Sequence, residues 1–184
     1  LWTIPKILVN DIPNSSNGTL SITLDTYNEL TKIGTTTTNF IVTIPDTDEF
    51  KPVITNILLS EAVEGLNEQF GFFIQSKSKI KGTIIANGVY GSTIKSYSVS
   101  INGQQLTSNP FITDELIGSG ICTVTITDTR NKSTTISKTY NCLDYFVPKI
   151  DFFDANRCDS NGNLDDEGDN VICEINASVS IAAY

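Results

Sequence analysis

The chain has 184 residues and a formal net charge of −9 at neutral pH, and it contains neither histidine nor methionine. The acidity disfavours binding to the phosphate backbone of a nucleic acid, and the absence of histidine excludes Ser-His-Asp and Cys-His catalysis. No run of about 18 apolar residues is present, so no transmembrane helix is predicted. The chain is instead rich in β-branched residues, with 24 Ile, 10 Val and 23 Thr, a composition that favours strands over helices.

The first predicted elements are two amphipathic strands around residues 20–24 and 40–44, on either side of Gly34. In both, apolar residues alternate with polar ones, which predicts one face in a core and the other in water. This hairpin matches the last hairpin of the unit that follows. We therefore predict that residues 1–47 are the C-terminal part of an immunoglobulin-like β-sandwich.

The next unit, residues 48–143, is predicted to be a complete sandwich. Short strands separated by turn signals every 8–12 residues are typical of immunoglobulin-like and fibronectin-like domains. The predicted strands are Val53–Leu59, Phe70–Gln75, Lys79–Ala86, Thr93–Ile101, one near Phe111, Ile121–Thr127 and Thr134–Cys142. The predicted fold class is all-β, with antiparallel sandwiches in tandem.

Residues 144–184 have room only for the opening hairpin of a further β domain. Its predicted strands are Lys149–Arg157 and Val171–Ser178, joined by an acidic loop. An incomplete sandwich exposes an apolar edge. We therefore expect the protein to continue on both sides of this sequence, or a partner chain to cover these edges.

Internal similarity supports a tandem array. Phe50–Ile57 recurs as Phe146–Phe153, 96 residues later, and Gly18–Thr26 recurs as Gly120–Asp128, 102 residues later. A period near 100 residues is typical of similar domains laid end to end.

The junctions between the units share an aromatic residue and a proline. Pro52 and Pro148 begin new units, where a residue without an N–H suits the first position of a strand. Phe50 and Phe146 precede them, and we predict that each plugs its junction and stiffens it. The array is then a semi-rigid rod.

Several segments together resemble the tail-associated minor structural proteins of siphophages that infect Gram-positive bacteria. They are Ile12–Asn14, Asp25–Asn28, Ser76–Lys81, Tyr90–Val99, Thr127–Asn131, Tyr145–Pro148, Arg157–Asp159 and Asp165–Gly168. Thr127–Asn131 resembles the family's Thr-Asp-Ser-Arg-Gly hairpin turn, with Thr129 and Asn131 as departures. The resemblance spans nearly the whole chain and implies a virion tail component near the host-attachment apparatus. It identifies no catalytic residue.

The acidic loop, residues 159–169, is rich in oxygen ligands, but Leu164 and Asn170 occupy positions where an EF-hand needs Gly and Glu. A solvated hairpin loop is the favoured interpretation, a different type of calcium site stays open, and we predict no tight Ca²⁺ binding. Arg157 is predicted to pin this loop through Asp165 or Asp166.

The four cysteines are treated as two cases. Cys122 and Cys142 are not directly opposed in the predicted register, and we expect both to be buried free thiols. A loop centred on Asp165 and Asp166 places Cys158 opposite Cys173, within reach of a disulfide. Assembly in a reducing cytosol argues for thiols, so the state of this pair is left open.

Aromatic side chains could stack on sugars. Tyr97 lies in register with Val99 and Ile101, which favours core packing, whereas Tyr90 follows a turn and is the better candidate for exposure. Trp2 and Tyr140 are further candidates, and packing is the favoured interpretation for such residues. No catalytic, cofactor-binding or metal-binding residue is predicted.

We therefore predict a non-enzymatic structural rod of a phage tail or tail fibre, one that positions or contributes to host receptor binding. The alternative is a bacterial cell-surface adhesin or carbohydrate-binding array of the same modules, located on the extracellular surface. Expected partners are other virion tail proteins, a host cell-surface glycan and further copies of the chain. Neither nucleic acid binding nor membrane insertion is expected.

Overall fold

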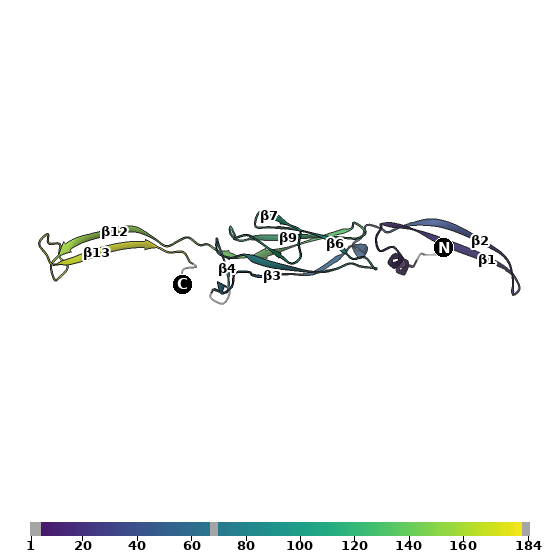
Figure 1. Ribbon diagram of the computed structural model, residues 1–184, viewed down its shortest axis with the longest axis horizontal. Helices are drawn as coiled ribbons and strands as arrows, with labels where there is room; N and C mark the ends of the chain where they lie inside the picture. Colours follow the sequence, from purple (N-terminus) through teal and green to yellow (C-terminus); the bar gives the residue numbers. More distant parts are fainter. Residues whose placement is uncertain (1–4, 67–69, 182–184) are drawn as a thin grey trace. The chain divides into compact units, whose positions relative to one another are not determined.

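A computed structural model describes residues 5–66 and 70–181 and is dominated by strands (Figure 1). The chain is all-β with several antiparallel sheets, so the predicted fold class is confirmed at that level. Within the described residues, no helix is long and apolar enough to cross a membrane. The boundaries predicted for the three domains stay a prediction.

The chain separates into two compact units. The first contains the residues up to Ser60, Ile80–Thr113 and Ile121–Tyr140, and the second contains Glu61–Lys79, Asp114–Gly120 and the residues from Asn141 onward. Segments that are distant in sequence therefore combine in each unit.

Most of the first unit is built from two sheets. One has the strand order β10-β9-β6-β7 and the other β3-β5-β8. Their strands are β3 (Val53–Glu61), β5 (Ile80–Asn87), β6 (Ile94–Ile101), β7 (Gln104–Leu106), β8 (Phe111–Ile112), β9 (Gly120–Asp128) and β10 (Ser133–Tyr140). The predicted strands all have counterparts here or in the second unit, whereas β7 was not predicted.

The core of this body follows from the alternation in the sequence. In β9, Cys122, Val124 and Ile126 are fully buried, and the threonines that alternate with them form hydrogen bonds to β10 on the outer face. In the other sheet Ile57, Ile80 and Ile84 are buried in the same way. Buried side chains on one face of each sheet are what face-to-face packing of two sheets requires.

The first unit also contains a separate two-stranded ribbon, β1 (Asn17–Asn28) paired with β2 (Thr31–Thr43), called the β1–β2 ribbon below. Two 3-10 helices flank it, η1 (Lys6–Asp11) and η2 (Asp48–Phe50). Most of the ribbon is exposed, and its buried contacts lie near its base.

The second unit contains a short parallel pair, β4 (Phe73–Ile74) with β11 (Cys142–Leu143), and a second antiparallel ribbon. This β12–β13 ribbon pairs β12 (Lys149–Cys158) with β13 (Asn170–Ser178), as predicted for the opening hairpin. Apart from Cys158 and the edge residue Ser178, its strand residues are exposed.

The predicted pairing of Cys158 with Cys173 is wrong. Cys158 lies opposite Asn170, and Cys173 lies opposite Ala155, three positions away. The loop between the strands is centred on Leu164, which bridges back to Cys158, so the register differs from the predicted one. All four cysteines are free thiols, with Cys122 buried as expected and Cys142 only half-buried.

Candidate functional site: a joint around Arg130

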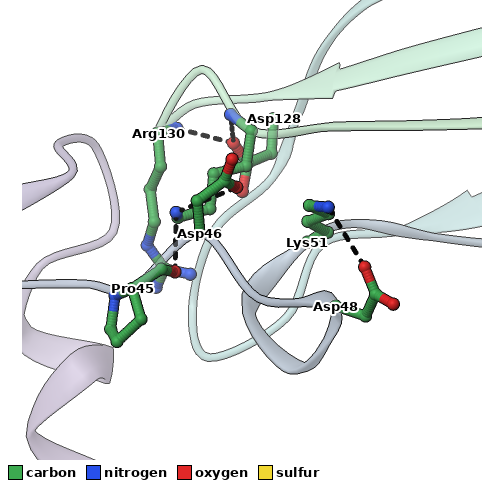
Figure 2. Close-up of polar contacts among 7 residues, drawn as sticks. Pro45, Asp46, Asp48, Lys51, Asp128 and Arg130 are labelled. Atoms are coloured by element: carbon green, nitrogen blue, oxygen red, sulfur yellow. Dashed lines mark hydrogen bonds and ion pairs between the residues drawn. The ribbon is translucent and has the colours of Figure 1, made fainter.

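The turn between β9 and β10 carries the most heavily bonded buried charge of the first unit. Arg130 is only 2% exposed. The carboxylate of Asp128 accepts hydrogen bonds from the backbone N–H groups of Arg130, at 2.9 Å, and Lys132, at 2.8 Å (Figure 2). Asn131 takes a φ of 64°, a conformation that asparagine tolerates better than most residues. The aspartate thus sets the turn that presents the arginine.

The guanidinium of Arg130 donates to four backbone carbonyls. Its Nε bonds the oxygen of Ile12 at 2.8 Å, and Nη1 bonds that of Val89 at 2.9 Å. Nη2 bonds the oxygen of Val9 at 3.2 Å and that of Tyr90. Two acceptors belong to the segment of η1 and two to the loop between β5 and β6, so one side chain holds both.

Burial lowers the pKa of the Arg130 guanidinium from its ordinary value, and the neighbouring Asp128 opposes this shift. A guanidinium keeps its charge in proteins because its ordinary pKa is so high. The role of Arg130 is therefore that of a permanent multiple donor. The second carboxylate oxygen of Asp128 is buried without a hydrogen-bond partner.

The loop that receives Arg130 is shaped for the contact. Tyr90 has a φ of 48°, which few residues other than glycine adopt, and Gly91 follows with a φ of 81°. A Cβ at Gly91 would lie 3.2 Å from the carbonyl oxygen of Asn10. Glycine is required there because the loop approaches η1 closely in a left-handed conformation.

Two further side chains of the same turn reach the segments around the β1–β2 ribbon. Lys132 is 7% exposed, and its Nζ bonds the carbonyl oxygen of Pro45 at 2.8 Å and the carboxylate of Asp46 at 3.5 Å. Figure 2 labels these two acceptors. Thr129 donates from Oγ1 to the carbonyl oxygen of Pro13 at 2.6 Å. The turn thus binds the chain on both sides of the ribbon.

An apolar cluster lies beside these polar contacts. Its buried members are Val9, Ile12, Ile44 and Phe50, with Val42 and Tyr90 packed against it. The rings of Phe50 and Tyr90 have centroids 5.3 Å apart. The base of the ribbon approaches so closely that a Cβ at Gly18 would be 2.7 Å from Ile12. The cluster forms the apolar part of the joint.

An exposed polar network closes the edge of the joint. Tyr90 donates from its hydroxyl to Glu49 at 3.0 Å, and Lys6 pairs with the same carboxylate at 2.6 Å. The hydrogen bond from Lys6, followed by that from Tyr90, lowers the pKa of Glu49. Lys51 forms an ion pair with Asp48 at 3.0 Å within the same short segment.

The two residues predicted to plug the junctions, Phe50 and Phe146, differ in burial. Phe50 is 7% exposed, as a plug requires, and Pro52 beside it is fully buried, whereas stiffening of a domain junction stays a prediction. The prediction for Phe146 is wrong, because Phe146 is 45% exposed. The neighbouring Tyr145 makes the contacts instead, with Lys77 lying 5.1 Å from its ring centroid and the amide of Gln75 accepting from its backbone.

Tyr90, the better candidate for exposure, is half-buried: its ring packs on Phe50, and its hydroxyl bonds Glu49 at an exposed contact. Tyr97 is half-buried in register with the buried Val99 and Ile101, as predicted, and Tyr140 is buried. Trp2 lies outside the described residues.

In the acidic loop, Arg157 donates to the carbonyl oxygens of Gly168 at 2.9 Å and Glu167 at 3.3 Å. It therefore pins the loop as predicted, but through backbone carbonyls and not through Asp165 or Asp166. The carboxylate of Asp159 accepts from Asn163 and Asn161, and the Asn163 contact does most to lower the pKa of Asp159. Across residues 5–66 and 70–181, no group of three or more His, Cys, Asp or Glu is placed to hold a metal.

Sequence reasoning located the turn at Thr127–Asn131 but missed the role of Arg130. The available signal was an arginine two residues after an aspartate in a tight turn, a spacing that lets one carboxylate hold the turn while the guanidinium points away from it. The acceptors gave no signal, because they are backbone carbonyls far away in the sequence.

The fold and this site define an all-β protein in which a buried arginine couples a hairpin ribbon to the neighbouring sheets. Comparison with protein families identifies the family of the chain. The chain belongs to the family described as "Siphovirus protein of unknown function (DUF859)", whose model matches residues 1–166. A search of curated proteins found no match. The siphophage origin that the resemblance implied is thereby confirmed, and it suggests a protein associated with the virion and with other virion proteins.

Proposed function

We propose that the chain is a connecting segment of the tail or tail fibre of a siphophage, built from immunoglobulin-like domains in tandem. The observation that carries the proposal is the joint at Arg130. One buried side chain bonds four carbonyls in two separate segments, an arrangement suited to holding a ribbon at a defined angle.

A repeated side-chain pattern supports the tandem arrangement. Across the β1–β2 ribbon, Thr23 bonds Thr37 at 3.0 Å, and across β9 and β10, Thr125 bonds Thr135 at 2.8 Å. Each pair lies in the middle of a three-rung ladder. The outer rungs are Ser21–Asn39 and Asp25–Thr35 in one ribbon, and Thr123–Ser137 and Thr127–Ser133 in the other. In both hairpins the polar ladder lies on one face, and alternating apolar residues of the first strand lie on the other.

The joint is expected to resist bending because a tilt breaks several hydrogen bonds of one buried side chain together. Tilting the ribbon would pull the carbonyl of Ile12, which lies in a buried hydrogen bond, away from Arg130. An unsatisfied buried polar group costs about 1–3 kcal/mol. Several such groups acting together give a stiff connection, as a rod that transmits position along a tail requires.

In this proposal the chain has no enzymatic activity. Its partners are other tail proteins, further copies of the chain and a glycan on a Gram-positive host. Direct glycan binding through Tyr90 is disfavoured because its ring and hydroxyl are both engaged. The adhesin alternative predicted from the sequence is the weaker candidate, since the family is siphoviral.

Electron microscopy of purified virions labelled with gold-conjugated antibodies against this chain tests the proposal. We expect label on the tail or its fibres, and the chain should be found by mass spectrometry of particles washed free of lysate. Label confined to the capsid, or a chain present in lysates but missing from purified virions, would contradict it.

A further inference from the structure

The first and last strands of the two sheets in the first unit are connected by side chains. β3 is the edge strand of one sheet, and β10 is the edge strand of the other. Thr134 of β10 donates from Oγ1 to the carbonyl oxygen of Pro52 at 2.5 Å, and Lys138 donates from Nζ to that of Ile57 at 2.6 Å. These two hydrogen bonds are called the edge seam below.

The two strands run in the same direction along the edge seam. Thr134 and Pro52 lie where β10 and β3 begin, whereas Lys138 and Ile57 lie further along both strands. The chain therefore enters the two sheets at one end of the edge seam, through Pro52. It leaves them beyond the other end, after Lys138.

The edge seam joins the strands without a backbone ladder, because β3 and β10 belong to different sheets. Its acceptors lie inside the molecule, since Pro52 is fully buried and Ile57 is 2% exposed. A groove lined by residues 51–54 and 133–135 lies between the beginnings of the two strands. Any sliding of one strand along the other would therefore break the two side-chain bonds of the edge seam.

The two ribbons have a different arrangement. In the β1–β2 ribbon the first residue, Asn17, pairs with the last, Thr43. In the β12–β13 ribbon Lys149 pairs with Ser178 in the same way. Tension on the chain pulls the two ends of such a ribbon apart at one pair, so the pairs open one after another. Tension across the edge seam acts along the strands and strains both of its bonds at once.

We propose that Thr134 and Lys138 form a clamp that keeps the two sheets of the first unit folded when the chain is under tension. Bonds that are strained together share the applied force, whereas bonds that open in sequence each experience all of it. The two sheets should therefore resist tension better than either ribbon does. This property goes beyond the stiffness of the joint at Arg130, and it does not depend on where the protein lies in a virion.

Optical-tweezers measurements on the full chain test the proposal through the direction of pulling. Handles attached to non-natural amino acids at residues 48 and 139, both exposed, stretch the edge seam along the strands. Handles at residues 48 and 133, also exposed, pull it open from one end. We expect unfolding of the two sheets to require a higher force in the first direction than in the second. Equal forces in the two directions would overturn the proposal.

Two variants remove the bonds of the edge seam while the direction of pulling stays the same. Thr134→Val replaces the hydroxyl with a methyl group, and Lys138→Met keeps much of the apolar stem and removes the donor. With handles at residues 48 and 139, the unfolding rate at a fixed force should rise about fivefold in each variant, because each loses one hydrogen bond that breaks in the rate-limiting step. Thr134→Ser keeps the hydroxyl and should unfold at the rate of the unchanged chain.

Thr125→Val is the matched control, since Thr125 bonds Thr135 between neighbouring strands of one sheet and not across the edge seam. Its unfolding rate at the same force should stay close to that of the unchanged chain. Circular dichroism checks that each variant folds, and Lys138→Met, at an exposed position, supplies the comparison if Thr134→Val does not fold. Seam variants that unfold at the unchanged rate, or a Thr125→Val chain that is weakened as much as they are, would contradict the proposal.

Discussion

The segments that begin at Phe50 and Phe146 share a sequence motif but differ in environment. Phe50 is 7% exposed and belongs to a four-residue apolar cluster, and Pro52 beside it is fully buried. Phe146 is 45% exposed, and Pro148 is exposed as well. An aromatic residue followed by a proline is therefore not sufficient to build a joint.

The difference lies in the residues that surround the motif. Phe50 is enclosed by Val9, Ile12 and Ile44, and the carbonyls of the first two are held by Arg130. The β12–β13 ribbon also has an arginine that bonds two carbonyls, but Arg157 is exposed and both acceptors lie in its own loop. A buried arginine that connects separate segments makes the joint, and the phenylalanine fills it.

The largest expected effect comes from Arg130→Met, which keeps much of the apolar stem and removes every donor. Ile12 and Tyr90 would lose the side chain that bonds their carbonyls, whereas the carbonyls of Val9 and Val89 keep donors from Ile12 and Ser92, so we expect a loss of about 4 kcal/mol in the free energy of unfolding of the first unit. Urea titration followed by circular dichroism measures it. Arg157→Met is the matched control and should cost less than about 1 kcal/mol, because its carbonyl partners can bond water. Equal losses in the two variants would remove the distinction between the arginines.

Truncation of the two phenylalanines sharpens the comparison. Phe50→Ala leaves a cavity in the cluster and should cost about 3 kcal/mol, whereas Phe146→Ala should cost less than about 1 kcal/mol. The same denaturation experiment measures both. A larger loss for Phe146→Ala would show that the second motif is a joint in solution.

Asp128→Asn removes the negative charge of the turn and keeps one oxygen that can accept hydrogen bonds. The remaining carbonyl oxygen can still accept from Arg130 and Lys132, but the new amide N–H₂ replaces a buried oxygen that has no partner. We expect a loss of about 1–2 kcal/mol, smaller than for Arg130→Met. Thermal unfolding of both variants in one buffer shows which loses more stability. A greater loss in Asp128→Asn than in Arg130→Met would show that the aspartate contributes more to the joint than the arginine does.

The smallest effect concerns pH. The contacts of Glu49 with Lys6 and Tyr90 lower its pKa below its ordinary value of 4.5, so its ionised form is favoured in the folded state. The stabilisation is fully present above pH 4.5 and is lost as the pH falls through the lowered pKa. The melting temperature of Glu49→Gln should therefore be slightly below that of the unchanged chain at neutral pH and should converge with it in acid. A difference that persists below that pKa would argue against this network.

Local patterns predicted the strands well because alternation and turn residues act over short distances. Cys122 was expected to be buried in the predicted strand Ile121–Thr127, and it is fully buried together with the alternating Val124 and Ile126. The pairing of Cys158 with Cys173 failed because a turn inside a long loop set the register, and an eleven-residue loop has many possible turns. The joint could not be predicted because the partners of Arg130 are carbonyls more than a hundred residues away at Ile12 and Val9, and backbone acceptors leave no mark in a sequence.

The central claim is that Arg130 holds the β1–β2 ribbon at a fixed angle to the sheets of the first unit. Pulsed electron resonance tests it most directly, with spin labels on non-natural amino acids at residues 37 and 98, both exposed. The account predicts a single narrow distance distribution in the unchanged chain and in Arg157→Met, and a broad one in Arg130→Met. A distribution in the unchanged chain as broad as that of Arg130→Met would contradict it.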